Sequence, residues 1–295
     1  MKFVAGIDGG GTKTRVLCRD SEGRELQEAQ FGPFNLNSIG LNRFRRLLEE
    51  ITALFRELGM CGGVCIGAAG ISNQEMVSAV AEAMARAGIA NWKLVGDHVI
   101  ALQGALRGRP GIALIAGTGS ICFGRNSSGQ EARAGGWGHL IGDEGSAYAL
   151  GRDALAAAAR QWDGYGAETA LTKLILEELH LDSRQGLISY IYGGDKTRIA
   201  ALSRLVERAA AGGDTVAGEI ISHNAEQMTG LVRAVAGKLG IERAEVAMLG
   251  GMLEHDTQLR RSFQEAMART CPGCSCVLPE LDAVHGAVML AETLF

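Results

Sequence analysis

Hydrophobic and polar positions predict a chain that begins with a strand meander and continues with alternating helices and strands. The apolar run over residues 3–8 predicts a buried strand, and residues 14–20 and 24–31 extend it around a turn at 21–23. Residues 42–58 have apolar side chains at helical spacing and stop at Gly59. The first third is completed by an expected strand at 64–69, helix at 74–87, strand at 92–96 and short helix at 99–106.

The pattern then starts again after residues 107–111, where Arg, Pro and Gly interrupt both helix and strand. This order of elements resembles a ribonuclease-H-like unit, and its repetition predicts a duplicated architecture. The second half is expected to contain strands at 112–116, 120–125 and 130–133, helices across 143–238, a strand near 246–249, a helix through Arg269, a strand at 275–278 and a last helix at 283–294 capped by Asp282.

Composition narrows the class of protein. A length of 295 residues fits one large or two ordinary domains, and a hydrophobic fraction of 47% predicts a sizeable core. The net charge of −4 gives no basic bias, so we expect no nucleic-acid partner. No apolar stretch reaches membrane-spanning length, and the start runs directly into a strand. We therefore expect no membrane partner and a cytoplasmic location.

The chain has seven cysteines, an odd number that favours reduced thiols. Cys271, Cys274 and Cys276 form the one cluster that could bind a metal ion. No second pair of cysteines or histidines accompanies it at zinc spacing. We therefore interpret the cluster as structural or incidental thiols.

Two glycine turns follow buried strands, Asp8-Gly9-Gly10-Gly11-Thr12-Lys13 and Gly117-Thr118-Gly119-Ser120. Glycine allows backbone N–H groups to approach an anion closely. The first turn is not a Walker A loop, because its lysine comes one position late, and it lacks the third glycine of a dinucleotide fingerprint. One such turn alone would be interpreted as an ordinary hairpin turn. Two such turns suggest two half-sites that bind one phosphate chain.

Three charged side chains, each at a strand end or in a glycine turn, have a functional and a structural interpretation. Asp8 could serve Mg²⁺ directly or through water, or satisfy N–H groups of its own turn. Lys13 could neutralise phosphate or lie in solvent. Asp97 follows the strand at 92–96, where it could cap a helix or act as general base toward an alcohol. We interpret His98 as structural.

Residues 134–147 are the densest functional candidate, because glycines surround Trp137 and His139 before two carboxylates. Sugars bind through hydrogen bonds to their hydroxyls and apolar surface against the ring. The alternative is a glycine-rich loop with Asp143 as a helix cap, which explains poorly why a tryptophan lies among glycines. Asn35 is a further polar candidate at a domain edge.

Together these motifs resemble the N-acetylglucosamine kinase group of the BadF/BadG/BcrA/BcrD family, in the sugar kinase, heat-shock protein and actin superfamily. The similarity spans residues 6–291. The residues that carry it are Asp8-Gly-Gly-Gly-Thr12, Asp97, Gly117-Thr-Gly-Ser120, Gly135-Gly-Trp-Gly-His-x-x-Gly-Asp-Glu-Gly-Ser146, Leu249-Gly-Gly251 and Asp282-Ala-Val-x-Gly-Ala287.

The resemblance implies an α/β fold of two ribonuclease-H-like (actin-like ATPase) domains with an interdomain cleft. We expect residues 1–107 with 284–295 in the first domain, and 108–283 with a helical insertion in the second. The implied reaction transfers a phosphoryl group from Mg-ATP to an amino-sugar 6-hydroxyl. The implied roles are nucleotide binding by Gly9, Gly10, Gly11, Thr12, Lys13, Gly117, Thr118, Gly119, Gly250 and Gly251; Mg²⁺ binding by Asp8; sugar binding by Asn35, Asp97, Gly135, Gly136, Trp137 and Asp143; and general-base catalysis by Asp97.

Other functions stay open from the sequence. The same family contains ATPases that activate dehydratases or reductases through an iron–sulfur cluster, and a sugar sensor without turnover would keep the same residues. Among kinases, glucosamine, N-acetylglucosamine and N-acetylmuramic acid are all candidate substrates. A homodimer is expected by analogy alone.

Overall fold

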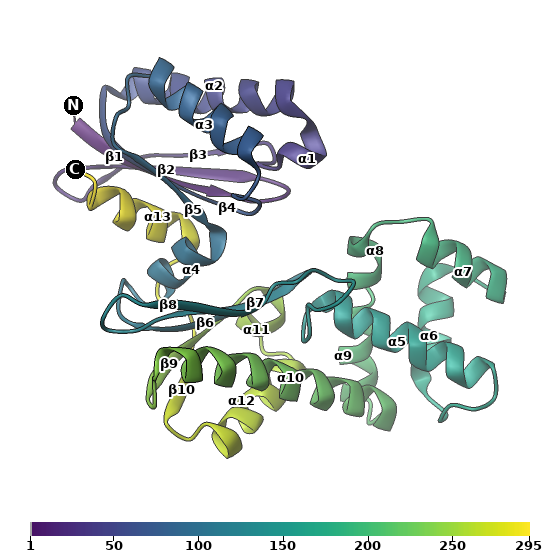
Figure 1. The fold of residues 1–295 in the computed structure, drawn as a ribbon. Coiled ribbons are helices and arrows are strands. Elements are labelled where there is room, and N and C mark those ends of the chain that lie inside the picture. Colours follow the sequence, from purple (N-terminus) through teal and green to yellow (C-terminus); the bar gives the residue numbers. More distant parts are fainter. Residues whose placement is uncertain (1) are drawn as a thin grey trace. The chain divides into compact units, whose positions relative to one another are not determined.

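Over the described residues, 2–295, the computed structural model contains two five-stranded sheets, one in each of two units (Figure 1). Unit 1 comprises the chain through Arg109 together with Pro279–Phe295, and unit 2 comprises Pro110–Leu278. The C-terminal helix therefore packs onto a sheet that is built from the first third of the chain.

The sheet of unit 1 has the order β3-β2-β1-β4-β5, with antiparallel pairs among the first three strands and parallel pairs from β1 to β5. Helices α2 and α3 cover one face, and α4 and α13 cover the other (Figure 1). The elements are β1 (Lys2–Gly9), β2 (Thr14–Asp20), β3 (Glu25–Phe31), α1 (Leu36–Ile39), α2 (Leu41–Leu58), β4 (Met60–Ala68), α3 (Gln74–Arg86), β5 (Trp92–Gly96), α4 (Asp97–Ala105) and α13 (Ala283–Glu292).

The sheet of unit 2 has the equivalent order, β8-β7-β6-β9-β10, with the same pattern of antiparallel and parallel pairs. A helical segment from α5 to α10 lies between β8 and β9 in the chain. The elements are β6 (Gly111–Ala116), β7 (Ser120–Arg125), β8 (Glu131–Gly135), α5 (Ala147–Trp162), α6 (Ala170–Leu179), α7 (Arg184–Tyr192), α8 (Lys196–Ala200), α9 (Ser203–Ala211), α10 (Thr215–Leu239), β9 (Ala244–Leu249), α11 (Gly251–Glu254), α12 (Gln258–Thr270) and β10 (Cys274–Val277).

The matching strand orders confirm the predicted α/β class and its duplicated architecture. The structure excludes the capping alternatives for two aspartates. Asp97 does not cap α4 but is its first residue, after Gly96. Asp143 does not cap α5, because the Ser146 side chain accepts the N–H of Ala149 there. One predicted helix was wrong. The helix expected through Arg269 is two helices, α11 and α12, separated at His255–Thr257, and the Thr257 side chain caps the second.

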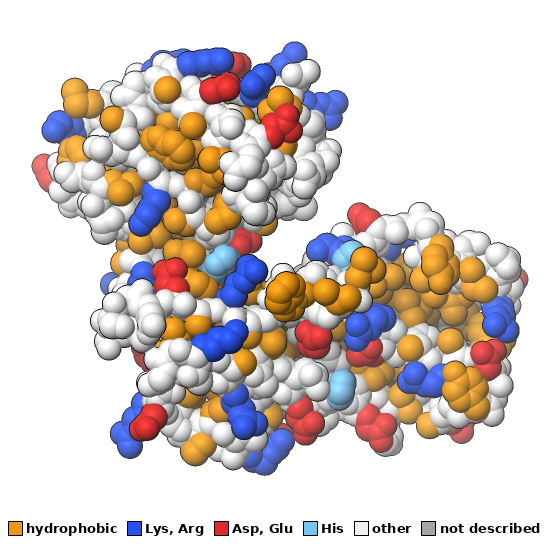
Figure 2. All heavy atoms as spheres, in the orientation of Figure 1, with side chains coloured by type: hydrophobic (Ala, Val, Ile, Leu, Met, Phe, Trp, Pro, Cys, Tyr) orange, Lys and Arg blue, Asp and Glu red, His pale blue; other side chains and the backbone are white. Residues whose placement is uncertain are grey.

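The charged side chains on the surface agree with the small net charge of the chain. On the face drawn in Figure 2, acidic and basic side chains are interspersed. No helix within residues 2–295 combines the length and the apolar character that a membrane crossing requires.

Helices α4 and α13 pack at very close distance because each contributes a glycine to the contact. A Cβ on Gly286 would lie 2.0 Å from the carbonyl oxygen of Ile100 and 2.5 Å from the amide nitrogen of Gly104. A Cβ on Gly104 would lie 2.2 Å from the carbonyl oxygen of Asp282. Backbone atoms cannot move aside as a flexible side chain can, so this crossing fixes the middle and C-terminal part of α4, the helix that begins at Asp97, against the start of α13.

We predict that Gly286→Ala lowers the free energy of unfolding of unit 1 by about 1–3 kcal/mol, because the added methyl group overpacks the crossing. Urea denaturation measures it. Gly218→Ala is the matched control: it lies within α10, a Cβ there meets nothing within 4 Å, and alanine should stabilise that helix by up to about 1 kcal/mol. Equal effects of the two substitutions would contradict the close packing.

Candidate functional site

The first glycine turn joins β1 to β2 and keeps its backbone accessible. The Gly10 amide donates to the Lys13 carbonyl at 3.0 Å, which closes the turn, while Gly11, Thr12 and Lys13 are exposed. Gly9 lies against the Phe34 ring, where a Cβ would be 2.8 Å from Cγ. The exposed N–H groups and hydroxyl of this turn are donors that suit phosphate oxygens.

Asp8 ends β1 just before this turn and is half-buried. Within residues 2–295 its carboxylate forms no hydrogen bond or ion pair. Burial raises the pKa of Asp8; Arg15 opposes the rise, and the negative charges of Asp97 and Asp282 add to it. A carboxylate without a protein partner among other negative charges fits a divalent cation.

The single carboxylate of Asp8 fits magnesium in particular. In the described part of the chain, no three His, Cys, Asp or Glu side chains gather in an arrangement that could hold a metal ion. Mg²⁺ does not need such a cage, because it keeps several waters and is commonly bound by one or two carboxylates together with substrate phosphates.

Asp97 reaches the same edge of the sheet as Asp8 because their strands are parallel and in register. Asp8 pairs with Gly67 of β4, and Ala68 pairs with Gly96 of β5, the residue before Asp97. The carboxyl ends of parallel strands are where α/β proteins place their binding residues. The structure therefore brings Asp8, Asp97 and the first glycine turn together within unit 1.

The local contacts of Asp97 favour its ionised form. Its Oδ1 accepts the N–H of His98 at 2.9 Å and lies 3.4 Å from the His98 Nδ1. Burial raises the pKa of Asp97, but the hydrogen bonds and charge of His98 outweigh it, so the net pKa is lowered. Its side chain is 54% exposed. An ionised and accessible carboxylate can accept a proton from an approaching hydroxyl.

Asn35 lies next to the first glycine turn. The Phe34 amide donates to the Gly10 carbonyl at 2.9 Å and joins the two segments. Asn35 occupies the N-cap position of α1, but its side chain makes no capping hydrogen bond, nor any other within residues 2–295. Its amide is thus free to bind a polar ligand.

The second glycine turn, in unit 2, is also closed by a backbone hydrogen bond, but over a shorter span than the first. The Gly117 amide donates to the Gly119 carbonyl at 2.9 Å, and the Gly117 carbonyl accepts from Ala147 at 2.8 Å. Thr118 is partly exposed between them. The turn is therefore attached to the first residue of α5.

Gly250 and Gly251 follow β9, which is parallel to β6, so they lie at the same sheet edge as the second turn. Gly250 has φ of +87°, and a Cβ there would be 2.4 Å from the Ala116 carbonyl oxygen. Gly251 is exposed, and a Cβ there meets nothing within 4 Å. The fold therefore requires glycine at position 250, whereas the surface around Gly251 is open.

Asp143 lies beneath the second glycine turn. It is 4% exposed, has φ of +66°, and its Oδ1 accepts the Ser120 amide at 3.3 Å. A Cβ on Gly119 would lie 2.8 Å from Oδ2, so the small residue makes room for the carboxylate. Its left-handed backbone is uncommon outside glycine and marks a position that the surrounding structure holds.

The loop after β8 exposes large apolar side chains. Trp137 is 69% exposed, and Leu140 and Ile141 are also exposed. Gly135 and Gly136 have φ of +73° and +69°, which turns the chain sharply before the tryptophan. An exposed aromatic ring beside backbone polar groups is the combination that sugar binding uses.

Two supporting residues were missed from the sequence. Arg15 pairs with Asp8 in the β1–β2 register, a relation that counting outward from the hairpin turn could have found. Asn224, buried in α10, accepts the Gly145 amide at 2.9 Å through its side chain and supports the loop. Asn224 could have been found from the sequence, because its side-chain amide stands alone among apolar positions of a helix.

The cysteines are free thiols in this structure. Cys122 is fully buried on β7, and burial raises its pKa. In the late cluster, burial and, to a smaller extent, the neighbouring thiols raise the pKa of Cys276 to about 11.

The fold and these residues define a class of protein that contains known sugar kinases. A crystal structure described as a candidate N-acetylglucosamine kinase from Chromobacterium violaceum matches with a TM-score of 0.79 and 27% identity, over 99% of each chain. The chain belongs to the BadF/BadG/BcrA/BcrD ATPase family, whose model matches residues 5–291.

Two relatives of known name match over nearly their full length. The N-acetylmuramic acid/N-acetylglucosamine kinase of Clostridium acetobutylicum is 37% identical over 303 residues, covering 99% of each chain. The N-acetyl-D-glucosamine kinase of Dictyostelium discoideum is 31% identical over 314 residues, covering 98% of each. The family resemblance seen in the sequence motifs is confirmed.

Proposed function

We propose that this protein is an ATP-dependent kinase that phosphorylates the 6-hydroxyl of an N-acetylated amino sugar, N-acetylglucosamine, N-acetylmuramic acid or both. The observation that carries the proposal is the accessible Asp97 carboxylate at the same sheet edge as Asp8, beside the first glycine turn. The two relatives named above act on these sugars, which supports the choice of substrate.

Each group then has a role that matches its chemistry. The turns of Gly9, Gly10, Gly11, Thr12 and Lys13, and of Gly117, Thr118 and Gly119, bind phosphate oxygens through N–H, hydroxyl and ammonium groups. Gly250 and Gly251 lie against the adenosine. Asp8 would hold Mg²⁺, which supplies positive charge to the phosphates.

The acceptor sugar is bound by side chains and by backbone. Asn35, Gly135, Gly136 and Asp143 hydrogen-bond its polar groups, and Trp137 packs on its apolar surface. Asp97 binds the reacting hydroxyl and accepts its proton as the oxygen attacks the γ-phosphorus, while the bond from that phosphorus to the β–γ bridging oxygen breaks and ADP leaves. Phosphoryl transfer depends mainly on positioning and charge stabilisation, so fixed groups of this kind suffice.

The alternatives have less support. An ATPase activator of a dehydratase or reductase needs cysteines at a dimer interface, but Cys122 is fully buried inside unit 2. A glucosamine kinase keeps the same phosphate groups and differs only in what surrounds the sugar nitrogen. The cytoplasmic location and the homodimer stay predictions from the sequence.

An assay of ADP release with Mg-ATP and a panel of sugars tests the proposal. We expect turnover with N-acetylglucosamine, N-acetylmuramic acid or both, and little with glucose or glucosamine. If glucosamine were the best substrate, the acceptor would be glucosamine and not an N-acetylated sugar. Slow ADP release independent of any sugar would instead favour the activator, to be followed by iron and sulfide analysis of anaerobically purified protein.

Asp97→Asn should lower kcat by about 10²- to 10⁴-fold, because it removes the base and keeps the shape of the side chain. Calorimetry should show sugar and ATP binding close to wild type. Asp163→Asn, which changes an aspartate at the end of α5, serves as the matched control and should leave kcat unchanged. A kcat near wild type for Asp97→Asn would refute the general-base role.

Trp137→Ala should raise the KM for the sugar by about tenfold, as expected for one lost aromatic contact, and change the KM for ATP far less. Because Trp137 is exposed, the free energy of unfolding should change by less than about 0.5 kcal/mol. Tyr192→Ala, another exposed aromatic residue, is the control. Equal increases in both KM values would exclude a specific contact with the sugar.

A further inference from the structure

Arg15 lies where an ion pair with Asp8 would be expected. The two residues are direct partners in the antiparallel register of β1 and β2, so their side chains point to the same face of the sheet. Directly opposed side chains have Cβ atoms about 5 Å apart, within easy reach of a guanidinium. Yet no hydrogen bond or ion pair within residues 2–295 joins Arg15 to Asp8.

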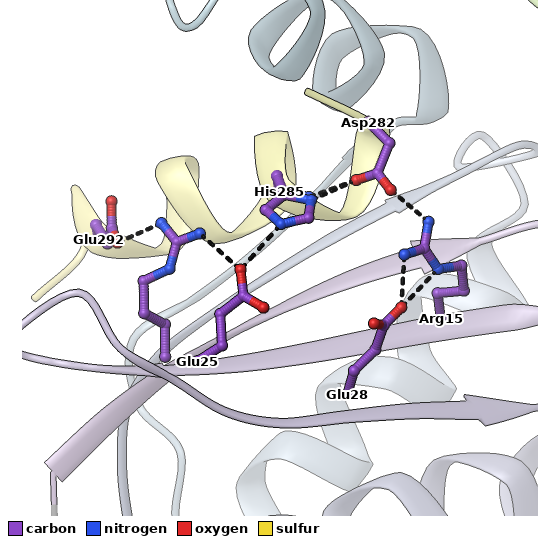
Figure 3. Close-up of polar contacts among 7 residues, drawn as sticks. Arg15, Glu25, Glu28, Asp282, His285 and Glu292 are labelled. Carbon is purple, nitrogen blue, oxygen red and sulfur yellow. Dashed lines mark hydrogen bonds and ion pairs between the residues drawn. The ribbon is translucent and has the colours of Figure 1, made fainter. Parts of the chain in front are cut away.

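The Arg15 guanidinium is instead bound by two other carboxylates (Figure 3). Its Nη2 and Nε donate to Glu28 Oε1 at 2.5 and 3.0 Å, and its Nη1 donates to Asp282 Oδ2 at 2.6 Å. Glu28 comes from β3 and Asp282 from the N-cap of α13. Three of its donor groups are therefore engaged by carboxylates other than Asp8.

Asp282 is itself fixed by further contacts. Its Oδ1 accepts the His285 amide at 3.2 Å and lies 2.6 Å from His285 Nδ1, while His285 Nε2 lies 3.1 Å from Glu25 (Figure 3). The same carboxylate therefore caps α13 and binds Arg15. The cap gives Asp282 a backbone anchor that does not depend on Arg15.

We propose that Glu28 and Asp282 are positioning residues that hold Arg15 away from Asp8, so that the Asp8 carboxylate stays available for the Mg²⁺ ion of the bound nucleotide. This inference rests on the proposed function. Arginine and carboxylate form strong, charge-assisted hydrogen bonds, so an Arg15 released from Glu28 and Asp282 would bind Asp8 and compete with the cation.

The test is binding of ADP measured by calorimetry over a range of Mg²⁺ concentrations. In the double variant Glu28→Gln/Asp282→Asn, the Mg²⁺ concentration for half-maximal ADP affinity should rise about tenfold, the order expected for one competing charge-assisted hydrogen bond. Asparagine is as good a helix cap as aspartate, so α13 keeps its N-terminus. A crystal structure of this variant should show Arg15 paired with Asp8.

Adding Arg15→Met to the double variant should restore the wild-type Mg²⁺ requirement, because no guanidinium then remains to compete. A structural role of Glu28 and Asp282 alone would not be rescued in this way. Glu22→Gln, which changes an exposed carboxylate paired with Arg24 on the same hairpin, is the matched control and should have no effect.

The single variant Arg15→Met keeps the proposal falsifiable if the double variant does not fold. It should bind ADP with the wild-type Mg²⁺ requirement, because Arg15 does not pair with Asp8 in the native protein. Weaker ADP binding at saturating Mg²⁺ would show that Arg15 contacts the nucleotide itself and would overturn the proposal. Failure of the wild-type protein to bind ADP with Mg²⁺ would refute the proposed function instead.

Discussion

The register of β1 with its two neighbours is the constraint on which the half-site of unit 1 depends. β1 pairs in parallel with β4 and antiparallel with β2, and both ladders run to its last residues. The parallel ladder aligns Asp8 with Gly67 of β4 and, through Gly67, with Val95, two residues before Asp97. The antiparallel ladder places Arg15 opposite Asp8. A shift of one residue in either ladder would move Asp8 to the other face of the sheet.

Unit 2 uses the same arrangement with different chemistry at its edge. β6 is the equivalent of β1, and its parallel partner β9 brings Gly250 beside the second glycine turn. Asp143 lies beneath that turn, but it comes from a loop rather than from the central strand. Duplication of a fold thus supplied two edges of the same geometry, and the residues at each edge diverged toward a catalytic and a binding role in the proposed reaction.

The sequence predicted most elements and the candidate residues, because both depend on local pattern. Buried strands followed by glycine turns are local features, and so is a carboxylate at a strand end. The partners of Arg15 could not be predicted, since Asp282 lies 267 residues further along the chain. The positive φ of Asp143 could not be predicted either, because a tertiary contact with Ser120 holds the residue in that conformation. Two helix starts were also misplaced: α4 begins at Asp97 rather than at residue 99, and α5 begins at Ala147, where Ser146 supplies the cap.

Three carboxylates near one another in unit 1 differ in pKa because their partners differ. Burial raises the pKa of all three, but His98 more than offsets this at Asp97, as do His285 and Arg15 at Asp282, so both end below the ordinary value. Asp8 has no such hydrogen-bonding partner, and its pKa stays raised. The protein therefore stabilises two of the negative charges through hydrogen bonds, whereas Asp8 has the charges of Arg15 and Lys13 but no hydrogen bond to offset its burial. In the proposed reaction, Mg²⁺ bound with the nucleotide would neutralise this carboxylate, which would couple occupancy of Asp8 to nucleotide binding.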